Sequence, residues 1–220
     1  IRLPRRRLPC SSLRQQTRPL LFVFLKELIM LQEQVIATDS VGCTVAQGSS
    51  VQEAAIAKGV YKIQCIGADG QIKWEEEMHN LTTNVGRQNM NAVYFSSSAA
   101  TATWYLGLVD GASSPTYAAG DTSSSHTGWT ENTGYSNSTR VTCSFGTATT
   151  ASPSVITNSS SPAAFSMNAT STIAGAFLIS NSTKGGSTGT LFSEASFSSP
   201  GNRSVVSGDT LNVTYTFSLS

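Results

Sequence analysis

The sequence predicts a mainly β fold, an antiparallel β-sandwich of jelly-roll or Ig-like type with one packed α-helix. Charged residues make up 12% of the 220 residues, which is about half the usual share. Ser, Thr, Asn, Ala and Gly replace them, and such residues suit the outer faces of strands better than exposed helices, which use Lys and Glu. Short segments of alternating apolar and polar residues also recur along the chain, with turn signals between them.

Residues 1–29 differ from the rest of the chain. Their Arg-rich start precedes the first acidic residue, Glu27, and leads into the apolar run 20–25. A positive stretch followed by an apolar one is typical of a secretory signal, but no small-residue cleavage site follows, and the run is too short to span a bilayer. A signal or anchor, an arm, and translated sequence upstream of a true start at Met30 remain the alternatives.

Residues 30–58 are interpreted as an N-terminal arm and residues 59–220 as a single β-sandwich domain. In the arm, the segment Ser50 to Glu53 matches a capping box. It predicts a short helical turn that continues through Ala57 and is closed by Gly59. The arm either docks elsewhere or is a loosely held terminus.

Charge and cysteine content limit the classes of protein. From Met30 onward acids outnumber bases, so we expect no binding of nucleic acid, which requires a basic patch. The cysteines lack the CxxC or His/Cys spacing of a zinc site. We expect single thiols and leave the disulfide state open, because only patterned cysteines indicate a disulfide framework. The four residues are Cys10, Cys43, Cys65 and Cys143.

Residues 60–78 predict a β-hairpin whose tight turn is Asp69-Gly70, since Gly adopts a positive φ at little cost. The returning strand contains the triplet 75–77, three glutamates that resemble metal-binding or acid/base carboxylates. Neighbours on a strand point to opposite faces, so only Glu75 and Glu77 share a side. Charged residues also protect sheet edges from unwanted pairing. We therefore interpret the triplet as a solvated strand edge.

The helix is expected at residues 85–95, where apolar residues return at a helical spacing. Thr83 or Asn84 can cap its N-terminus. Ala174 to Ile179 is the most apolar run and predicts a central strand. The last strand alternates cleanly from Leu211 to Leu219, so it should close the core, and its deletion should prevent folding. The strands expected after the helix are 104–109, 140–145, 163–168, 173–180, 191–197 and 211–219.

A long Gly- and Ser-rich loop follows the strand at Trp104 and contains the candidate site. Its members are Asp121, His126, Trp129 and Glu131. A Ser/His/Asp hydrolase would need a nucleophile on a strained turn, and no GxSxG motif is present. A calcium loop would need regularly spaced oxygen ligands, which the loop lacks. We therefore expect no catalytic residue, no cofactor and no metal ligand.

The loop is interpreted instead as a structural or contact element. Asp121 and Ser123 would cap local turns, His126 would hydrogen-bond the loop, and Trp129 would pack the loop onto the sandwich. The rival hypothesis is a glycan-binding platform, because aromatic faces stack well on apolar surfaces. Its candidate residues are Trp104, Tyr105, Tyr117, Trp129 and Tyr135.

Several motifs resemble an uncharacterised family of virion structural proteins of tailed bacteriophages. The resemblance covers roughly residues 59–220, and it is carried mainly by two central motifs. In chain order, all the segments that match, central and peripheral, are Lys73-Trp74-Glu75, His79-Asn80-Leu81-Thr82-Thr83, Trp104-Tyr105-Leu106-Gly107-Leu108, Ala119-Gly120-Asp121-Thr122, Ser125-His126-Thr127-Gly128-Trp129-Thr130-Glu131 and Ser207-Gly208-Asp209-Thr210-Leu211-Asn212-Val213-Thr214-Tyr215.

The resemblance implies a component of the virion and carries over no catalytic residue. The expected function is a non-enzymatic capsid decoration (cement) protein that stabilises the shell. Its expected partners are the major capsid protein or other virion proteins and further copies of itself, with no nucleic acid and no membrane. The alternative is a tail- or fibre-associated protein that binds a host surface glycan. A third class, a secreted hydrolase or adhesin, depends on a signal within residues 1–29.

Overall fold

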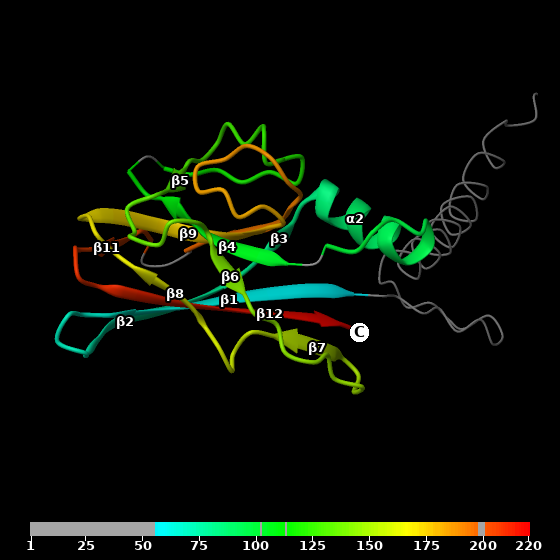
Figure 1. Ribbon diagram of the computed structural model, residues 1–220, viewed down its shortest axis with the longest axis horizontal. Coiled ribbons are helices and arrows are strands. Elements are labelled where there is room, and N and C mark those ends of the chain that lie inside the picture. Colours follow the sequence, from blue (N-terminus) through cyan, green and yellow to red (C-terminus); the bar gives the residue numbers. More distant parts are fainter. Residues whose placement is uncertain (1–55, 102, 113, 198–200) are drawn as a thin grey trace, which may run out of the picture. The chain divides into compact units, whose positions relative to one another are not determined.

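Two antiparallel β-sheets dominate the part of the chain that the computed structural model describes, residues 56–101, 103–112, 114–197 and 201–220 (Figure 1). The first sheet has the strand order β2-β1-β12-β7, with β8 also paired to β12. Strands β1 and β12 pair from Ala57↔Leu219 to Ile66↔Thr210. The strands of this sheet are β1 (Ala57–Ile66), β2 (Ile72–His79), β7 (Ser154–Thr157), β8 (Ala163–Ser166) and β12 (Thr210–Leu219).

The second sheet has the order β3-β10-β9-β4-β5, with β11 paired to β9 and β6 paired to β4. Its strands are β3 (Leu81–Thr82), β4 (Trp104–Asp110), β5 (Glu131–Asn132), β6 (Val141–Cys143), β9 (Ser171–Ile179), β10 (Leu191–Ser196) and β11 (Arg203–Val205). The predicted central strand is therefore confirmed as β9. The predicted fold class is confirmed as well, as a mainly β antiparallel sandwich with one helix among the described residues.

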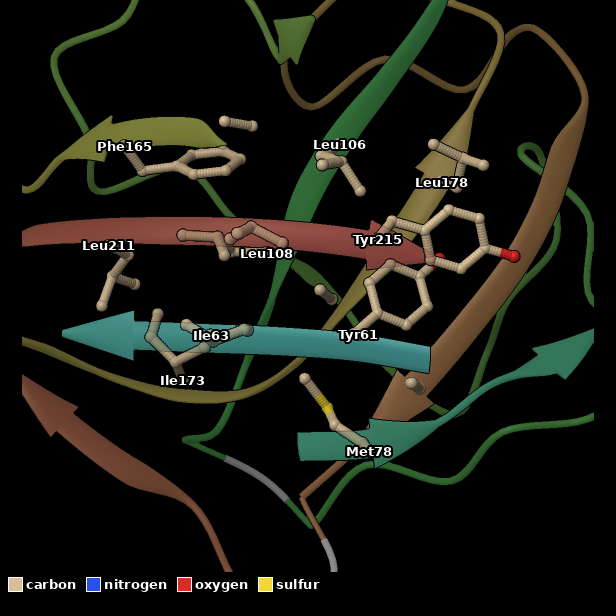
Figure 2. Packing of buried hydrophobic residues seen from close by; sticks show 14 of the residues in the cluster. Tyr61, Ile63, Met78, Leu106, Leu108, Phe165, Ile173, Leu178, Leu211 and Tyr215 are labelled. Atoms are coloured by element: carbon tan, nitrogen blue, oxygen red, sulfur yellow. The ribbon is translucent and has the colours of Figure 1, made fainter. Parts of the chain in front are cut away.

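The main core lies between the two sheets (Figure 2). Alternate residues of β1 and β12 are fully buried, as the two-residue period of a strand requires. The hydroxyl of Tyr61 on β1 lies 2.7 Å from Ser193 Oγ on β10, so a polar contact joins the sheets inside the core. The ring of Tyr61 also lies 4.5 Å from that of Tyr215.

The two cysteines within the described residues, Cys65 and Cys143, are buried free thiols, as expected. Burial raises the pKa of Cys65 to about 11 and that of Cys143 to about 12. Both thiols therefore stay protonated and unreactive at neutral pH. Cys10 and Cys43 lie outside the described residues.

The second sheet is covered on both of its faces. A smaller apolar cluster on its outer face joins Val109 of β4 and Phe177 of β9 to Trp129 of the loop after β4. That loop lies over the sheet (Figure 1). A strand with two covered faces needs apolar residues at every position. This explains why the run 173–179 in β9 is continuously apolar and fully buried.

One predicted helical segment is a strand in the structure. Residues 57–59 begin β1, where we expected the end of a helical turn. Pairing with the C-terminal strand overrides the local capping pattern, since Ile56 N donates to Ser220 O at 2.6 Å and Ser220 N donates back to Ile56 O at 3.1 Å. The rest of that turn, residues 50–55, and the predictions for residues 1–49 lie outside the described residues.

The solvated-edge interpretation is wrong for one residue of the acidic triplet. β2 is an edge strand, and Glu75 and Glu77 are exposed on it. The side chain of Glu76, however, is only 12% exposed and forms an ion pair with Arg203 of β11. This carboxylate therefore ties the edge of the first sheet to the second sheet.

Helix α2 (Asn84–Phe95) follows β3 and confirms the predicted helix and its cap. The side chain of Thr83 accepts a hydrogen bond from Gly86 N at 3.0 Å. Gly86 is buried against the backbone of Phe192, where a Cβ would not fit, so the first turn lies close to β10. The C-terminal turn is exposed, with Tyr94 80% and Phe95 85% accessible.

Candidate functional site

Three of the four candidate residues meet in the loop between β4 and β5. Trp129 is only 4% exposed, and its indole packs on Phe177 of β9 with 5.0 Å between ring centroids. The His126 ring stacks on the same indole at 4.0 Å, and His126 Nδ1 lies 3.0 Å from the backbone oxygen of Trp129. Trp129 thus anchors the loop on the outer face of the second sheet.

Two carboxyl groups converge on the indole N–H of Trp129. Its Nε1 donates to Glu194 Oε2 at 3.0 Å and to Asp121 Oδ2 at 3.2 Å. Glu194 lies on β10 and is fully buried. Burial, together with the negative charge of Asp121, raises the pKa of this carboxyl to about 8, although the indole N–H opposes the shift. Glu194 is therefore mostly protonated at neutral pH.

Sequence reasoning missed Glu194. The one available signal is its place in β10, where an acid occurs inside a strand that is otherwise apolar or small, LFSEAS. An acid at a buried strand position needs either a cation or a proton. The structure supplies no cation within 4.0 Å of Glu194 among the described residues, which leaves the proton.

The centre of this cluster is closed to solvent. Glu194 Oε1 and the Tyr117 hydroxyl are both buried, and neither has a hydrogen-bond partner among the described residues. Protonation turns one oxygen of Glu194 into a donor, so it can form hydrogen bonds that a carboxylate cannot. Because Glu194 has no exposed surface, a substrate cannot touch its carboxyl group in this arrangement.

The fourth candidate, Glu131, belongs to a different network. Both of its carboxylate oxygens accept from Arg140, with Nη2 to Oε2 at 2.7 Å and Nε to Oε1 at 3.1 Å. The two side chains are 6% and 3% exposed. Arg140 also donates to the backbone oxygens of Asn181 and Gly186. The pair therefore fastens the loop 180–190 to β5.

The polar groups of the loop are engaged in holding the loop itself. His126 contacts a backbone oxygen, and Asp121 Oδ2 accepts from Ala118 N and from the indole. Ser123 Oγ donates across to Thr188 O at 2.9 Å instead of capping its own turn. Residues 56–101, 103–112, 114–197 and 201–220 contain no group of three His, Cys, Asp or Glu side chains arranged to hold a metal ion.

The aromatic residues proposed as a glycan platform are dispersed. Tyr135 is fully buried against Phe165, whereas Trp104 packs on Phe192 beside α2. Tyr117 stacks on Trp129 at 6.3 Å inside the loop. Tyr105, like Tyr117, packs against the outer-face cluster that contains Trp129. The five residues are therefore divided between that cluster and the main core.

An apolar surface lies instead at the α2 end of the sandwich. The exposed ring of Tyr94 lines a hollow of about 380 Å³ between α2 and the ends of both sheets, and the exposed Phe95 follows it as the last residue of α2. We call the hollow and these two rings the α2 surface. The hollow is lined by Asn89, Met90, Val93, Tyr94, Ala100, Thr101, Trp104, Phe145, Ile156, Leu178, Phe192, Tyr215 and Phe217.

Comparison of the chain with protein-family models, with curated protein sequences and with solved structures gave no match. Among the described residues, α2 falls short of the length and hydropathy that a membrane-crossing helix needs.

Proposed function

We propose that this protein is a non-enzymatic structural component of a tailed-phage virion, most simply a capsid decoration protein. The α2 surface is the observation that carries the proposal. Contiguous exposed apolar side chains next to a hollow are typical of a contact surface with another molecule. The resemblance of the central motifs to virion structural proteins adds the setting in which such a contact would be made.

A decoration protein works through shape and buried area. It covers the junctions between neighbouring shell subunits, so that expansion of the shell must first break those contacts. A stable contact of this kind buries about 1,200–2,000 Å² in total. The polar candidates in the loop support this mechanism indirectly, because Asp121, His126 and Glu131 are engaged in holding the fold.

The alternative, a tail-associated protein that binds a glycan, has less support. Stacking on a sugar requires an exposed aromatic face. Trp129 is 4% exposed and Tyr135 is fully buried. A glycan site would therefore have to use other side chains of the chain.

Cryo-electron microscopy of the purified particle whose genome encodes this chain tests the proposal. We expect density for the sandwich repeated over the capsid lattice. Density confined to the tail would favour the glycan-binding alternative. Absence of the protein from the particle would refute the proposal.

A further inference from the structure

The hollow of the α2 surface reaches into the main core. Its floor includes Leu178 and Tyr215, which belong to the buried cluster between the sheets, and its walls include the half-buried rings of Phe145 and Phe217. A group that enters the hollow would exchange water for contact with these side chains. Concave apolar pockets of this kind accept the central anchor residues of protein interfaces.

A second hollow of about 450 Å³ lies nearer the N-terminus of helix α2 than the first hollow, and Met90 lines both. Arg87 is its charged member, beside Ile56 and Thr82. Arg87 is exposed, and no described carboxylate lies within 4.0 Å of its guanidinium. Helix α2 also has no acid in its first turn. This end of the surface is therefore complementary to a carboxylate.

The cation and the apolar hollow are aligned along one helix. Residues three or four positions apart on a helix share a face, so Arg87, Met90 and Tyr94 form a single stripe. Seven residues at the helical rise of 1.5 Å place Arg87 about 10 Å from Tyr94 along the axis. A strand advances ~3.3 Å per residue, so an extended segment covers the same span in about three residues.

We propose that the α2 surface binds a segment of a neighbouring, different protein chain. An aromatic or branched apolar side chain of that segment fills the hollow, and an Asp or Glu about three residues away pairs with Arg87. This inference rests on the proposed function, because it names the chemistry of the contact that an assembly component makes. A two-fold pairing of this chain with itself through the α2 surface is disfavoured, because both copies would present the same patch. That patch contributes Arg87 but no carboxylate to pair with it, since no acid lines either hollow or occupies the first turn of α2.

Photo-crosslinking in the assembled particle identifies the occupant. Tyr94 of the full chain is replaced by p-benzoylphenylalanine, and the crosslinked peptides are mapped by mass spectrometry after irradiation. We expect a crosslink to another virion protein, on a segment with a carboxylate about three residues from an apolar residue. Crosslinks only to a second copy, to lipid or to nothing would overturn the inference. Ile72, exposed on β2, is the control position.

Substitutions measure how much the contact contributes to incorporation. Ala100→Trp fills the hollow without removing a side chain, and Arg87→Glu reverses the charge. We expect the first to lower occupancy in the particle at least tenfold and the second several-fold. The matched controls are Ala68→Trp, at the exposed hairpin turn, and Lys58→Glu. Ala57 lines the second hollow. Successive residues of a strand point to opposite faces, so the side chain of Lys58 points away from the hollow.

The outcomes separate this inference from the proposed function. Absence of the wild-type protein from the particle contradicts the function itself. Normal incorporation of wild type and of both α2-surface variants contradicts only the inference. Thermal unfolding of each variant verifies that it is folded, and Arg87→Glu keeps the test decisive if Ala100→Trp does not fold, because Arg87 is exposed.

Discussion

Glu194 accepts a hydrogen bond from the indole Nε1 of Trp129 at 3.0 Å, at a fully buried position beside Asp121. The same N–H donates to Asp121 Oδ2, so one donor serves two carboxyl groups. Two negative charges so close together in a dry site repel each other strongly. The loop therefore packs on the second sheet at neutral pH with a proton on this pair.

Glu194→Gln should remove a pH dependence from the free energy of unfolding. The pKa of Glu194 is raised from its usual 4.5 to about 8 in the folded protein. The folded state then holds a proton that the unfolded state releases between these values, so the contribution of Glu194 to stability is fully present below pH 4.5 and is lost as the pH rises to 8. The slope for one such group is about 1.4 kcal/mol per pH unit.

Urea unfolding between pH 5 and pH 8 checks this. We expect the wild-type free energy of unfolding to decline relative to Glu194→Gln, whose amide keeps a hydrogen-bonding side chain and cannot ionise. Glu77→Gln, at an exposed position of β2, should follow the wild type. Parallel curves for the wild type and Glu194→Gln would show that Glu194 is not protonated in the fold.

Arg140→Ala should destabilise the protein by about 3–5 kcal/mol, the usual cost of removing one member of a buried ion pair. It leaves Glu131 buried without its cation and releases the backbone oxygens of Asn181 and Gly186. Equilibrium urea unfolding measures the loss. The comparison variant is Lys62→Ala. Lys62 forms an exposed ion pair with Glu75 at 2.9 Å, and the loss of such a pair should lower the free energy of unfolding by less than about 1 kcal/mol. Equal effects would mean that burial of the Arg140 pair does not matter.

Gly175→Ala should destabilise the central strand. A Cβ at Gly175 would collide with the backbone oxygen of Ala195 on β10, and overpacking of this type typically costs about 1–3 kcal/mol. Gly120→Ala is the control, because a Cβ there meets nothing within 4 Å, and a surface change of this kind should stay within about 0.5 kcal/mol. Thermal unfolding of the two variants ranks them, and equal midpoints would contradict the close approach of β9 and β10.

The elements that the sequence predicted correctly are those with long hydrophobic patterns, and these elements were enough to indicate the fold class. Strands β9 and β12 each have several residues of clear apolar or alternating pattern, and α2 carries its own cap at Thr83. The sequence did not predict β3, β5, β7 and β11, which have two to four residues each, because so short a segment shows no period. It misplaced residues 57–59 because their pairing partner lies at the other end of the chain, with Ser218 opposite Lys58.

The candidate loop shows a similar limit. Clustering in sequence correctly joined Asp121, His126 and Trp129, which lie within one turn-rich segment. The side chain of Glu131, at the first residue of β5, does not join them, because it pairs with Arg140 instead. Clustering in sequence also gave no reason to add Glu194, 65 residues beyond Trp129, since only the packing of the loop onto the second sheet brings that strand position under the indole.

Asp121→Ala combined with His126→Ala should leave incorporation into the particle close to wild type. Both side chains contact parts of the fold around Trp129: Asp121 contacts Ala118 N, the indole N–H and Glu194, and His126 contacts the backbone oxygen and the ring of Trp129. Their removal should lower stability, because a contact of this kind is worth about 0.5–1.5 kcal/mol, but it leaves the α2 surface intact. Occupancy in purified particles, measured beside the thermal midpoint, separates the two effects. A folded double variant that is lost from the particle would show that the loop itself makes a contact or performs chemistry.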